Sequence, residues 1–205
     1  MKSSTTNSDP TRRTLLFAGF CGAVALRVSP ARALSDDEAR FLIDAVVDDI
    51  HRVINSGMPI QAALKEFEKV FVNYADVQAI ARSALGPPAR TASPRQLRAF
   101  TDAFSGYISR KYGKRFREFK GGVIEVTDAR KRSRVHEVRA IARLKGREPL
   151  AMSFVVSDRS GKTLFIDILI EGISLLKSER VEIGALLDRQ GGDVDRLVAA
   201  LNGSG

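Results

Sequence analysis

Cysteine, tryptophan and histidine are scarce in this chain of 205 residues, which has one Cys, no Trp and two His. A single cysteine excludes an intrachain disulfide and a cysteine-based metal cluster. The sequence has no run of about 18 apolar residues, so a conventional membrane-spanning helix is not expected. The HExxH, GxSxG, Walker A and GxGxxG patterns are missing as well, so no local motif indicates a metalloprotease, a serine hydrolase or a nucleotide-binding enzyme.

The composition is that of an ordinary globular protein, with 44% apolar and 28% charged residues. The 33 Lys and Arg outnumber the 24 Asp and Glu, which gives a net charge of +9. Residues 1–33 hold +4 of this charge, which leaves +5 on residues 34–205. Such a mild excess gives little support for nucleic-acid binding, so nucleic acid is not expected as a partner. A modest attraction to anionic lipid surfaces is more natural.

Residues 1–33 have the three parts of a cleaved secretory signal peptide. Arg12 and Arg13 precede an apolar stretch over residues 15–26, and Ala31 and Ala33 form an Ala-x-Ala end. The arginine pair favours the twin-arginine export route, and an ordinary Sec signal with a chance arginine pair is the alternative. Either route predicts an exported protein that begins near residue 34 and has lost its one cysteine with the signal.

Residues 34–205 are predicted to form a single domain of the α+β class, with helices on either side of a run of strands. Ser35 and Glu38 form a capping box, and Ser93 and Gln96 form a second one, so a helix is expected to begin at each. The helices are expected over residues 35–57, from 59 through 71, and over 76–85, 93–119, 175–189 and 193–202.

Four β-branched, mostly alternating stretches predict four antiparallel strands joined by short turns. They cover residues 123–127, 135–144, 150–157 and 163–170. Strict alternation in the last strand would place Leu164, Ile166, Ile168 and Ile170 on one face of the sheet.

Asp167 interrupts this last apolar strand and is expected to face away from Ile166 and Ile168. A carboxylate in this place is best explained by a partner across the sheet, either Arg139 or Arg143. The other interpretation is a general base in a cone-shaped pocket.

Several short motifs follow one another along the chain after Phe71. They are Ala81-Arg82-Ser83-Ala84-Leu85-Gly86, Ser93-Pro94-Arg95-Gln96, Phe100 with Phe104, Tyr112-Gly113, Gly161 with Asp167, Glu171-Gly172-Ile173-Ser174-Leu175, and Gly192-Asp193-Val194-Asp195-Arg196-Leu197. In this order they resemble the MlaC/toluene-tolerance family of periplasmic phospholipid carriers. The family often has a Trp shortly before the strand aspartate, where this chain has Phe165.

The resemblance implies a carrier without a catalytic group or cofactor, in which the bound phospholipid is cargo. It implies an NTF2-like, curved four-stranded antiparallel sheet wrapped by helices, with an apolar cavity between them. Implied partners are an inner-membrane ABC transporter complex and an outer-membrane lipoprotein–porin complex. The implied role is to keep outer-membrane lipid asymmetry from the periplasm, and the chain is expected to be a monomer.

The cavity is expected to lie at or beyond the large end of the usual range of roughly 300–1,000 Å³. Candidate lipid-binding residues share an apolar character and lie on the predicted strands or the long helix; plain core is the alternative for each. They are Phe100, Phe104, Ile108, Val138, Ala140, Leu150, Met152, Phe154, Ile166 and Ile168.

A basic run flanks Tyr112 on the long predicted helix and comprises Arg110, Lys111, Lys114, Arg115 and Arg117. It is either a site for a lipid phosphate or an acidic partner, or a solvated helix face.

Other functions stay open beside the phospholipid carrier. One is an NTF2-like small-molecule enzyme that uses Asp167 or His136, although a Ser–His–Asp triad built on His51 or His136 has no local support. A pure interaction module and a carrier of another apolar lipid, such as a hopanoid, are the others.

Overall fold

The structure is a computed structural model that describes residues 33–116 and 119–203. The chain from Ala33 onward forms one compact unit. The predicted signal peptide lies outside the described residues except for Ala33, so it stays a prediction.

The first helix begins at the capping box that the sequence predicts. Ser35 Oγ accepts the Glu38 N–H at 3.2 Å, and the Glu38 carboxylate accepts the Ser35 N–H at 2.9 Å. This reciprocal pair satisfies two of the backbone donors that a helix start leaves free. Before the sheet come α1 (Asp36–Asn55), α2 (Ile60–Tyr74), α3 (Val77–Leu85), the short 3-10 helix η1 (Pro87–Arg90) and α4 (Pro94–Phe116). After it come α5 (Leu175–Arg189) and α6 (Val194–Gly203).

The sheet has five strands in sequence order, and every neighbouring pair is antiparallel. The α+β class is therefore confirmed, and the predicted count of four strands is wrong. The added strand has only two residues, too few to show a periodic pattern. The strands are β1 (Val123–Arg132), β2 (Val135–Arg143), β3 (Leu150–Ser157), β4 (Leu164–Ile170) and β5 (Ile173–Ser174).

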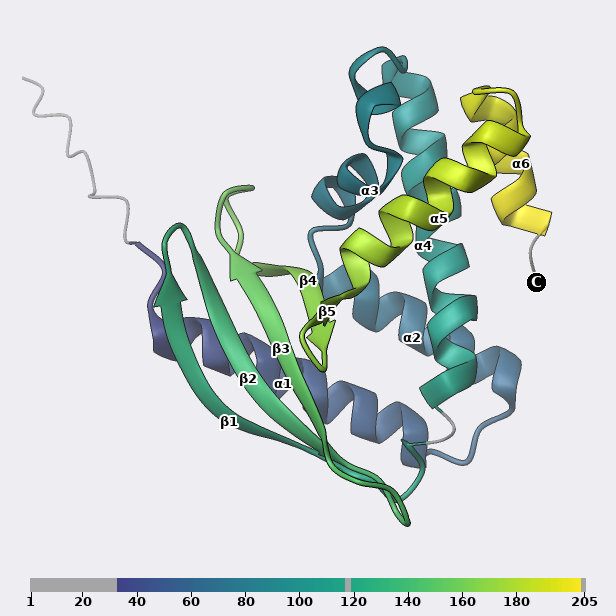
Figure 1. Ribbon diagram of the computed structural model, residues 1–205. Coiled ribbons are helices and arrows are strands. Elements are labelled where there is room, and N and C mark those ends of the chain that lie inside the picture. Colours follow the sequence, from purple (N-terminus) through teal and green to yellow (C-terminus); the bar gives the residue numbers. More distant parts are fainter. Residues whose placement is uncertain (1–32, 117–118, 204–205) are drawn as a thin grey trace, which may run out of the picture. The chain divides into compact units, whose positions relative to one another are not determined.

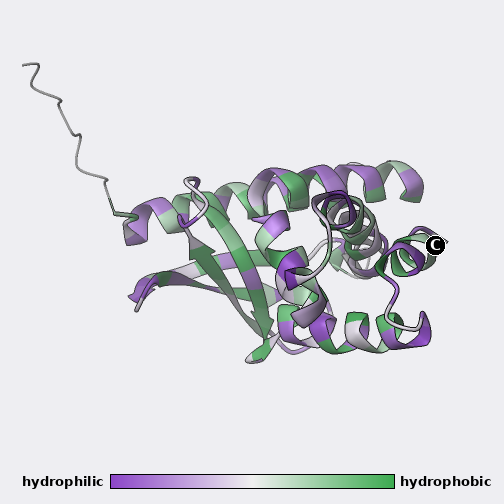
Figure 2. Ribbon diagram, turned by 90° about the horizontal axis from the view of Figure 1, so that it is seen from above, coloured by the Kyte–Doolittle hydropathy of each residue, from purple (hydrophilic) through white to green (hydrophobic). Residues whose placement is uncertain are grey.

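The helices pack on one another and on one side of the sheet (Figure 1). α1 crosses β1 and β2, while α2 contacts both α1 and α4. α3 contacts α4 and α5, and α6 packs on α4. Figure 2 shows the central strands mostly in the hydrophobic colour, whereas α1 alternates between hydrophilic and hydrophobic stretches, as expected of a helix with one buried face. The likeness to the NTF2-like fold stays a prediction.

Two β-bulges break the alternation of the strands. In β1 the register with β2 shifts between Val126 and Asp128. The strand continues past this shift to Arg132, so its predicted end at residue 127 is wrong. In β4 the extra residue is Ile166, because Asp167 pairs with Val155 while Phe165 pairs with Val156.

The bulge in β4 turns Phe165 into the core, where its side chain is only 4% exposed. The prediction that Leu164 shares one face with Ile168 and Ile170 is wrong, because one inserted residue reverses the side chains beyond it, whereas Ile166 borders the cavity together with Ile168 and Ile170. The Phe165 carbonyl also accepts the Asp76 N–H at 2.9 Å, which ties β4 to the start of α3.

Candidate functional site

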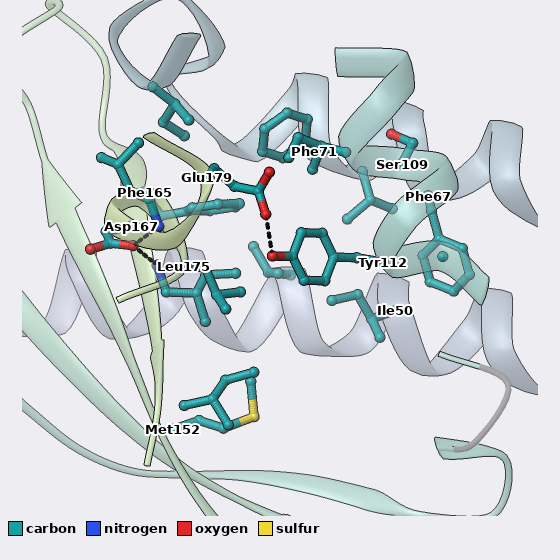
Figure 3. A pocket seen from close by; sticks show the side chains of 18 of the residues that line it. Ile50, Phe67, Phe71, Ser109, Tyr112, Met152, Phe165, Asp167, Leu175 and Glu179 are labelled. Atoms are coloured by element: carbon teal, nitrogen blue, oxygen red, sulfur yellow. Dashed lines mark hydrogen bonds between the residues drawn. The ribbon is translucent and has the colours of Figure 1, made fainter. Parts of the chain in front are cut away.

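A cavity of about 340 Å³ lies between the sheet and the helices (Figure 3). Residues of α1 to α5, of β3 and β4, and of the loop between β2 and β3 form its wall, and most of these side chains are apolar. The volume is near the lower end of the range for ligand pockets, so the prediction of a large cavity is wrong for this structure. The rings of Phe67, Phe71, Phe104 and Phe165 border the cavity.

Six of the ten predicted lipid-binding residues border this cavity: Phe104 and Ile108 from α4, Leu150 and Met152 from β3, and Ile166 and Ile168 from β4. The other four lie in the adjoining core and are at most 2% exposed: Phe100, Val138, Ala140 and Phe154. Alternation cannot separate the two groups, because cavity and core share one apolar face of the sheet. Contact of any of the ten residues with lipid stays a prediction.

The sequence-based prediction named no cavity residue from α1, α2 or α5. Ile50 of α1 and Phe67 and Phe71 of α2 border the cavity, and so does Leu175 at the start of α5. Helical spacing marks the apolar face of each helix, but it does not say which other element that face meets.

Asp167 borders the cavity, and its carboxylate holds the start of α5. Its Oδ1 accepts the backbone N–H of Leu176 at 3.0 Å and that of Ile168 at 2.8 Å, and its Oδ2 accepts the Ser174 hydroxyl at 2.5 Å. A helix start leaves unpaired N–H groups and a partial positive charge, and both favour a carboxylate at this point. The geometry is that of a helix cap, since donors already occupy both oxygens.

The predicted partners of Asp167 are therefore wrong. Arg139 pairs with Glu137 at 3.2 Å, and Arg143 lies 3.8 Å from Glu125. Both arginines belong to β2, which β3 separates from β4. Two strand spacings amount to roughly 10 Å, which is too far for a direct ion pair.

A group of charged and phenolic side chains joins α4 to α5 at one wall of the cavity. Lys111 Nζ donates to Glu179 Oε1 at 2.7 Å and to Glu182 Oε2 at 2.5 Å. The Tyr112 hydroxyl donates to Glu179 Oε1 at 2.6 Å, as Figure 3 shows, and the Tyr107 hydroxyl donates to Glu182. We call these five residues the α4–α5 polar cluster. Glu179 is only 3% exposed, and a carboxylate so deeply buried needs such partners.

Burial and hydrogen bonds shift the pKa values within the polar cluster. Burial raises the pKa of Tyr107 to about 12, and its hydrogen bond to Glu182 acts in the same direction. Burial, followed by the hydrogen bond to Glu179, also raises the pKa of Tyr112. For Glu182 burial acts upward, but the hydrogen bonds from Lys111 and Tyr107 outweigh it and lower the pKa. For Lys111 burial acts downward, and the hydrogen bonds to both glutamates outweigh it and raise the pKa.

All three tyrosines are expected to titrate above pH 10 in the folded protein. The hydrogen bond to Asp49, and then burial, raises the pKa of Tyr74 as well. Because each folded-state pKa exceeds the unfolded value of about 10, the folded protein holds these protons more tightly, and stability should fall as the pH rises above about 10.

Tyrosinate absorbance measures this titration directly, since the chain has three Tyr and no Trp. The native curve should lie above that of the protein in denaturant, which should titrate near pH 10. Coincident curves would contradict the hydrogen bonds of the three phenols in the folded protein.

The predicted basic run on α4 is not one free cationic surface. Arg110 Nη2 donates to the Leu201 carbonyl of α6 at 2.7 Å, and Lys111 belongs to the polar cluster. This corrects the prediction for these two residues, whose donors are used within the protein. The side chains of Lys114 and Arg115, and all of Arg117, lie outside the described part of the chain.

The two histidines tie α1 to the sheet. His51 Nε2 accepts the Ile124 N–H at 3.0 Å, and His136 Nδ1 lies 2.6 Å from Asp36 Oδ1. Neither histidine is among the residues that border the cavity. These contacts give both histidines a structural role, and the small-molecule enzyme stays an untested alternative.

Two searches of the described residues bear on membranes and metals. Within 33–116 and 119–203, no helix combines the length and the apolar character that crossing a bilayer requires. Over the same ranges, no group of three or more His, Cys, Asp or Glu side chains is placed to hold a metal ion.

Comparisons with known proteins point in one direction. The family model described as MlaC protein matches residues 44–203. A search of curated proteins finds no match. Among solved structures, the chain is similar to a phospholipid-binding protein from Ralstonia solanacearum, solved in complex with a phospholipid. The TM-score is 0.69 and the identity 22%, over 80% of this chain and 94% of that one, so the likeness shows a shared fold.

Proposed function

Because the chain belongs to the MlaC family, we propose that it is a periplasmic phospholipid carrier. It takes lipid between an outer-membrane lipoprotein–porin complex and an inner-membrane ABC transporter complex and so maintains outer-membrane lipid asymmetry. The observation that carries the proposal is the apolar cavity between sheet and helices in a member of this family.

A carrier that moves lipid through water needs an apolar cavity for the acyl chains. A diacyl lipid has about 30 methylenes, and at about 0.8 kcal/mol each their exposure to water costs more than about 20 kcal/mol. Lipid therefore does not cross an aqueous gap unaided at a useful rate. A cavity about as apolar as the bilayer removes that barrier. The free energy of the lipid is then nearly equal in the membrane and in the carrier, so that loading and unloading are both feasible. The lining by Ile, Leu, Phe and Met side chains meets this need.

Arg147 gives the cavity a cationic border. It is exposed, lies in the loop between β2 and β3, and contributes to the cavity wall. Since an exposed residue borders the cavity, the cavity reaches the surface at this loop. A guanidinium there suits a lipid phosphate that stays in contact with water while the acyl chains go inside.

The cavity must widen to take a whole diacyl lipid. Its volume of about 340 Å³ is small for two acyl chains, and Phe67 and Phe71 of α2 and Ile108 of α4 stand at its wall. α2 and α4 are already in close contact at Gly113, where an added Cβ would lie 2.4 Å from Leu64 Cδ2. Outward movement of the aromatic side chains, rather than closer packing of these helices, is the expected response to lipid.

Analysis of lipid in the purified protein tests the proposal. The full chain is expressed with its own signal, isolated from the periplasm and extracted, and the extract is identified by mass spectrometry. Phospholipid in stoichiometric amount is expected, and the loaded protein should donate it to acceptor vesicles. A folded protein that contains no lipid, and takes up none from phospholipid vesicles, would overturn the proposal. A hopanoid or another apolar lipid in the extract would replace the cargo and keep the carrier.

A further inference from the structure

The cavity has an open end and a closed end, which lie at opposite ends of the strands. Among the described residues that border it, only Arg147 is exposed, so the open end lies at the loop between β2 and β3. That loop leads into β3 at Leu150, whereas Phe165 of β4 pairs with Val156 near the far end of β3. Six residue steps separate Leu150 from Val156, which at about 3.3 Å each places Phe165 roughly 20 Å from the start of β3. Acyl chains that enter at the loop therefore run toward Phe165.

Phe165 closes the inner end of the cavity. Its buried ring packs on Phe71 of α2 and on Phe154 of β3, with the ring centroids 6.2 Å apart in both pairs. Figure 3 shows the Phe165 side chain pointing from β4 into the cavity. Ile80 of α3 borders the cavity as well. Phe154 is buried and is not among the bordering residues, so core rather than cavity lies beyond the Phe165 ring.

The backbone holds Phe165 in place from two sides. On one side Phe165 pairs with Val156 of β3, and the bulge at Ile166 turns its side chain inward. On the other side its carbonyl accepts the Asp76 N–H at 2.9 Å, and Ala75 forms a parallel β-bridge with it. A residue pinned by two neighbouring segments cannot move away without breaking these hydrogen bonds. Phe165 is therefore a fixed end wall, whereas the aromatic side chains of α2 can move outward when lipid enters.

A fixed end wall limits the length of the acyl chains that fit. Up to that length, transfer from an apolar bilayer to an apolar cavity is nearly neutral for each methylene. A methylene that finds no room either stays in water or displaces core side chains, and each one in water lowers the affinity by about fourfold. Loading should therefore depend little on chain length up to a limit and fall steeply beyond it.

We propose that Phe165 sets the greatest acyl-chain length that the protein accepts. This inference rests on the proposed function, that the cavity takes phospholipid. It makes Phe165 a specificity-determining residue, and it names the feature of the lipid that the protein selects, which is the length of its acyl chains.

Competitive loading tests the limit. The full chain is expressed, and the protein is isolated from the periplasm and delipidated. It is then brought to exchange equilibrium with fluid vesicles that contain equal amounts of phosphatidylglycerols, which differ only in acyl-chain length, in steps of two carbons. Bound lipid is counted by mass spectrometry. The wild type should load the shorter lipids equally and should disfavour the first lipid beyond the limit by on the order of tenfold.

Two variants of Phe165 should move the limit in opposite directions. Phe165→Ala removes the ring and extends the cavity toward Phe154, so the limit should rise by at least one step of two carbons. Phe165→Trp places a larger ring at the inner end, so the limit should fall. Leu197→Ala is the matched control, since Leu197 of α6 is a buried core residue that does not border the cavity. It should lose stability through the deleted side chain and keep the wild-type limit.

The outcomes separate this inference from the proposed function. Equal loading of every chain length by the wild type overturns the role of Phe165 and leaves the carrier intact. So does a limit that stays in place in the folded Phe165 variants, or one that moves as far in Leu197→Ala as in Phe165→Ala. Failure of the wild type to load any of the lipids overturns the proposed function itself. If Phe165→Ala does not fold, Phe165→Trp decides the matter, since it keeps an aromatic ring in the core.

Discussion

Replacing Ile168 with glutamate is expected to reduce lipid loading by well over tenfold. Ile168 lies in the middle of β4, borders the cavity and faces Phe154 across the sheet. A carboxylate there would stand among acyl chains with no hydrogen-bond donor to meet it, at a cost of several kcal/mol. In the empty protein the same carboxylate can be solvated through the cavity, so the fold should survive. Lipid per protein, counted by mass spectrometry after incubation with vesicles, is the measurement.

Leu169→Glu is the matched control. Leu169 is the next residue of the same strand, is partly buried like Ile168, and points to the other face of the sheet, opposite Ser153. This variant should load lipid as the wild type does, and circular dichroism should show the same secondary structure in both variants. Equal loading by Ile168→Glu and Leu169→Glu would remove Ile168 from the lipid-binding surface.

Replacing Lys111 with methionine is expected to lower the free energy of unfolding by about 3 kcal/mol. The substitution removes the ion pair of Glu179, which is only 3% exposed. Its carboxylate then keeps only the hydrogen bond from the Tyr112 hydroxyl. Removal of one member of a buried ion pair typically costs about 3–5 kcal/mol, and the lower end applies because the Lys111 side chain is itself 26% exposed. Urea unfolding at neutral pH measures the change.

A double variant separates the charge from the packing. In Lys111→Met/Glu179→Gln the side chain at position 179 carries no charge that needs a partner, so most of the lost stability should return. Lys177→Met is the control, because Lys177 is exposed on α5, and its loss should stay within about 0.5 kcal/mol. A loss below about 1 kcal/mol in Lys111→Met would mean that water reaches Glu179 and that the cluster is not a buried network.

Features that depend on neighbouring residues could be predicted from the sequence. Both capping boxes are confirmed, since Ser93 Oγ accepts the Gln96 N–H at 3.2 Å and the Gln96 side chain accepts the Ser93 N–H at 3.0 Å. The start of each long strand lies within one residue of its predicted place. Such features follow from hydrogen bonds and spacing over three or four residues, which the sequence displays directly.

Features that depend on distant residues could not be predicted in this way. The bulge at Ile166 arises from pairing with β3 and from the hydrogen bond between Phe165 and Asp76, and it reverses which side chain of β4 faces inward. The cap that Asp167 gives to α5 requires the turn into β5 to bring Ser174 and Leu176 back to β4. The sequence-based prediction assigned Asp167 to an arginine of β2 instead, although β3 separates that strand from β4.

By itself the sequence determined the order of the α-helices and the four long strands, the α+β class and the membership of a lipid-carrier family, because these depend on local spacing and on motifs that stand in a fixed order. Only the tertiary structure decided which apolar side chains border a cavity and which fill the core, since both kinds show the same alternation. It alone brought Lys111 to Glu179, 68 positions further along the chain, and left one buried carboxylate oxygen unpaired at the cavity wall. Contacts between residues so far apart arise from the packing of α4 against α5, which no local pattern encodes.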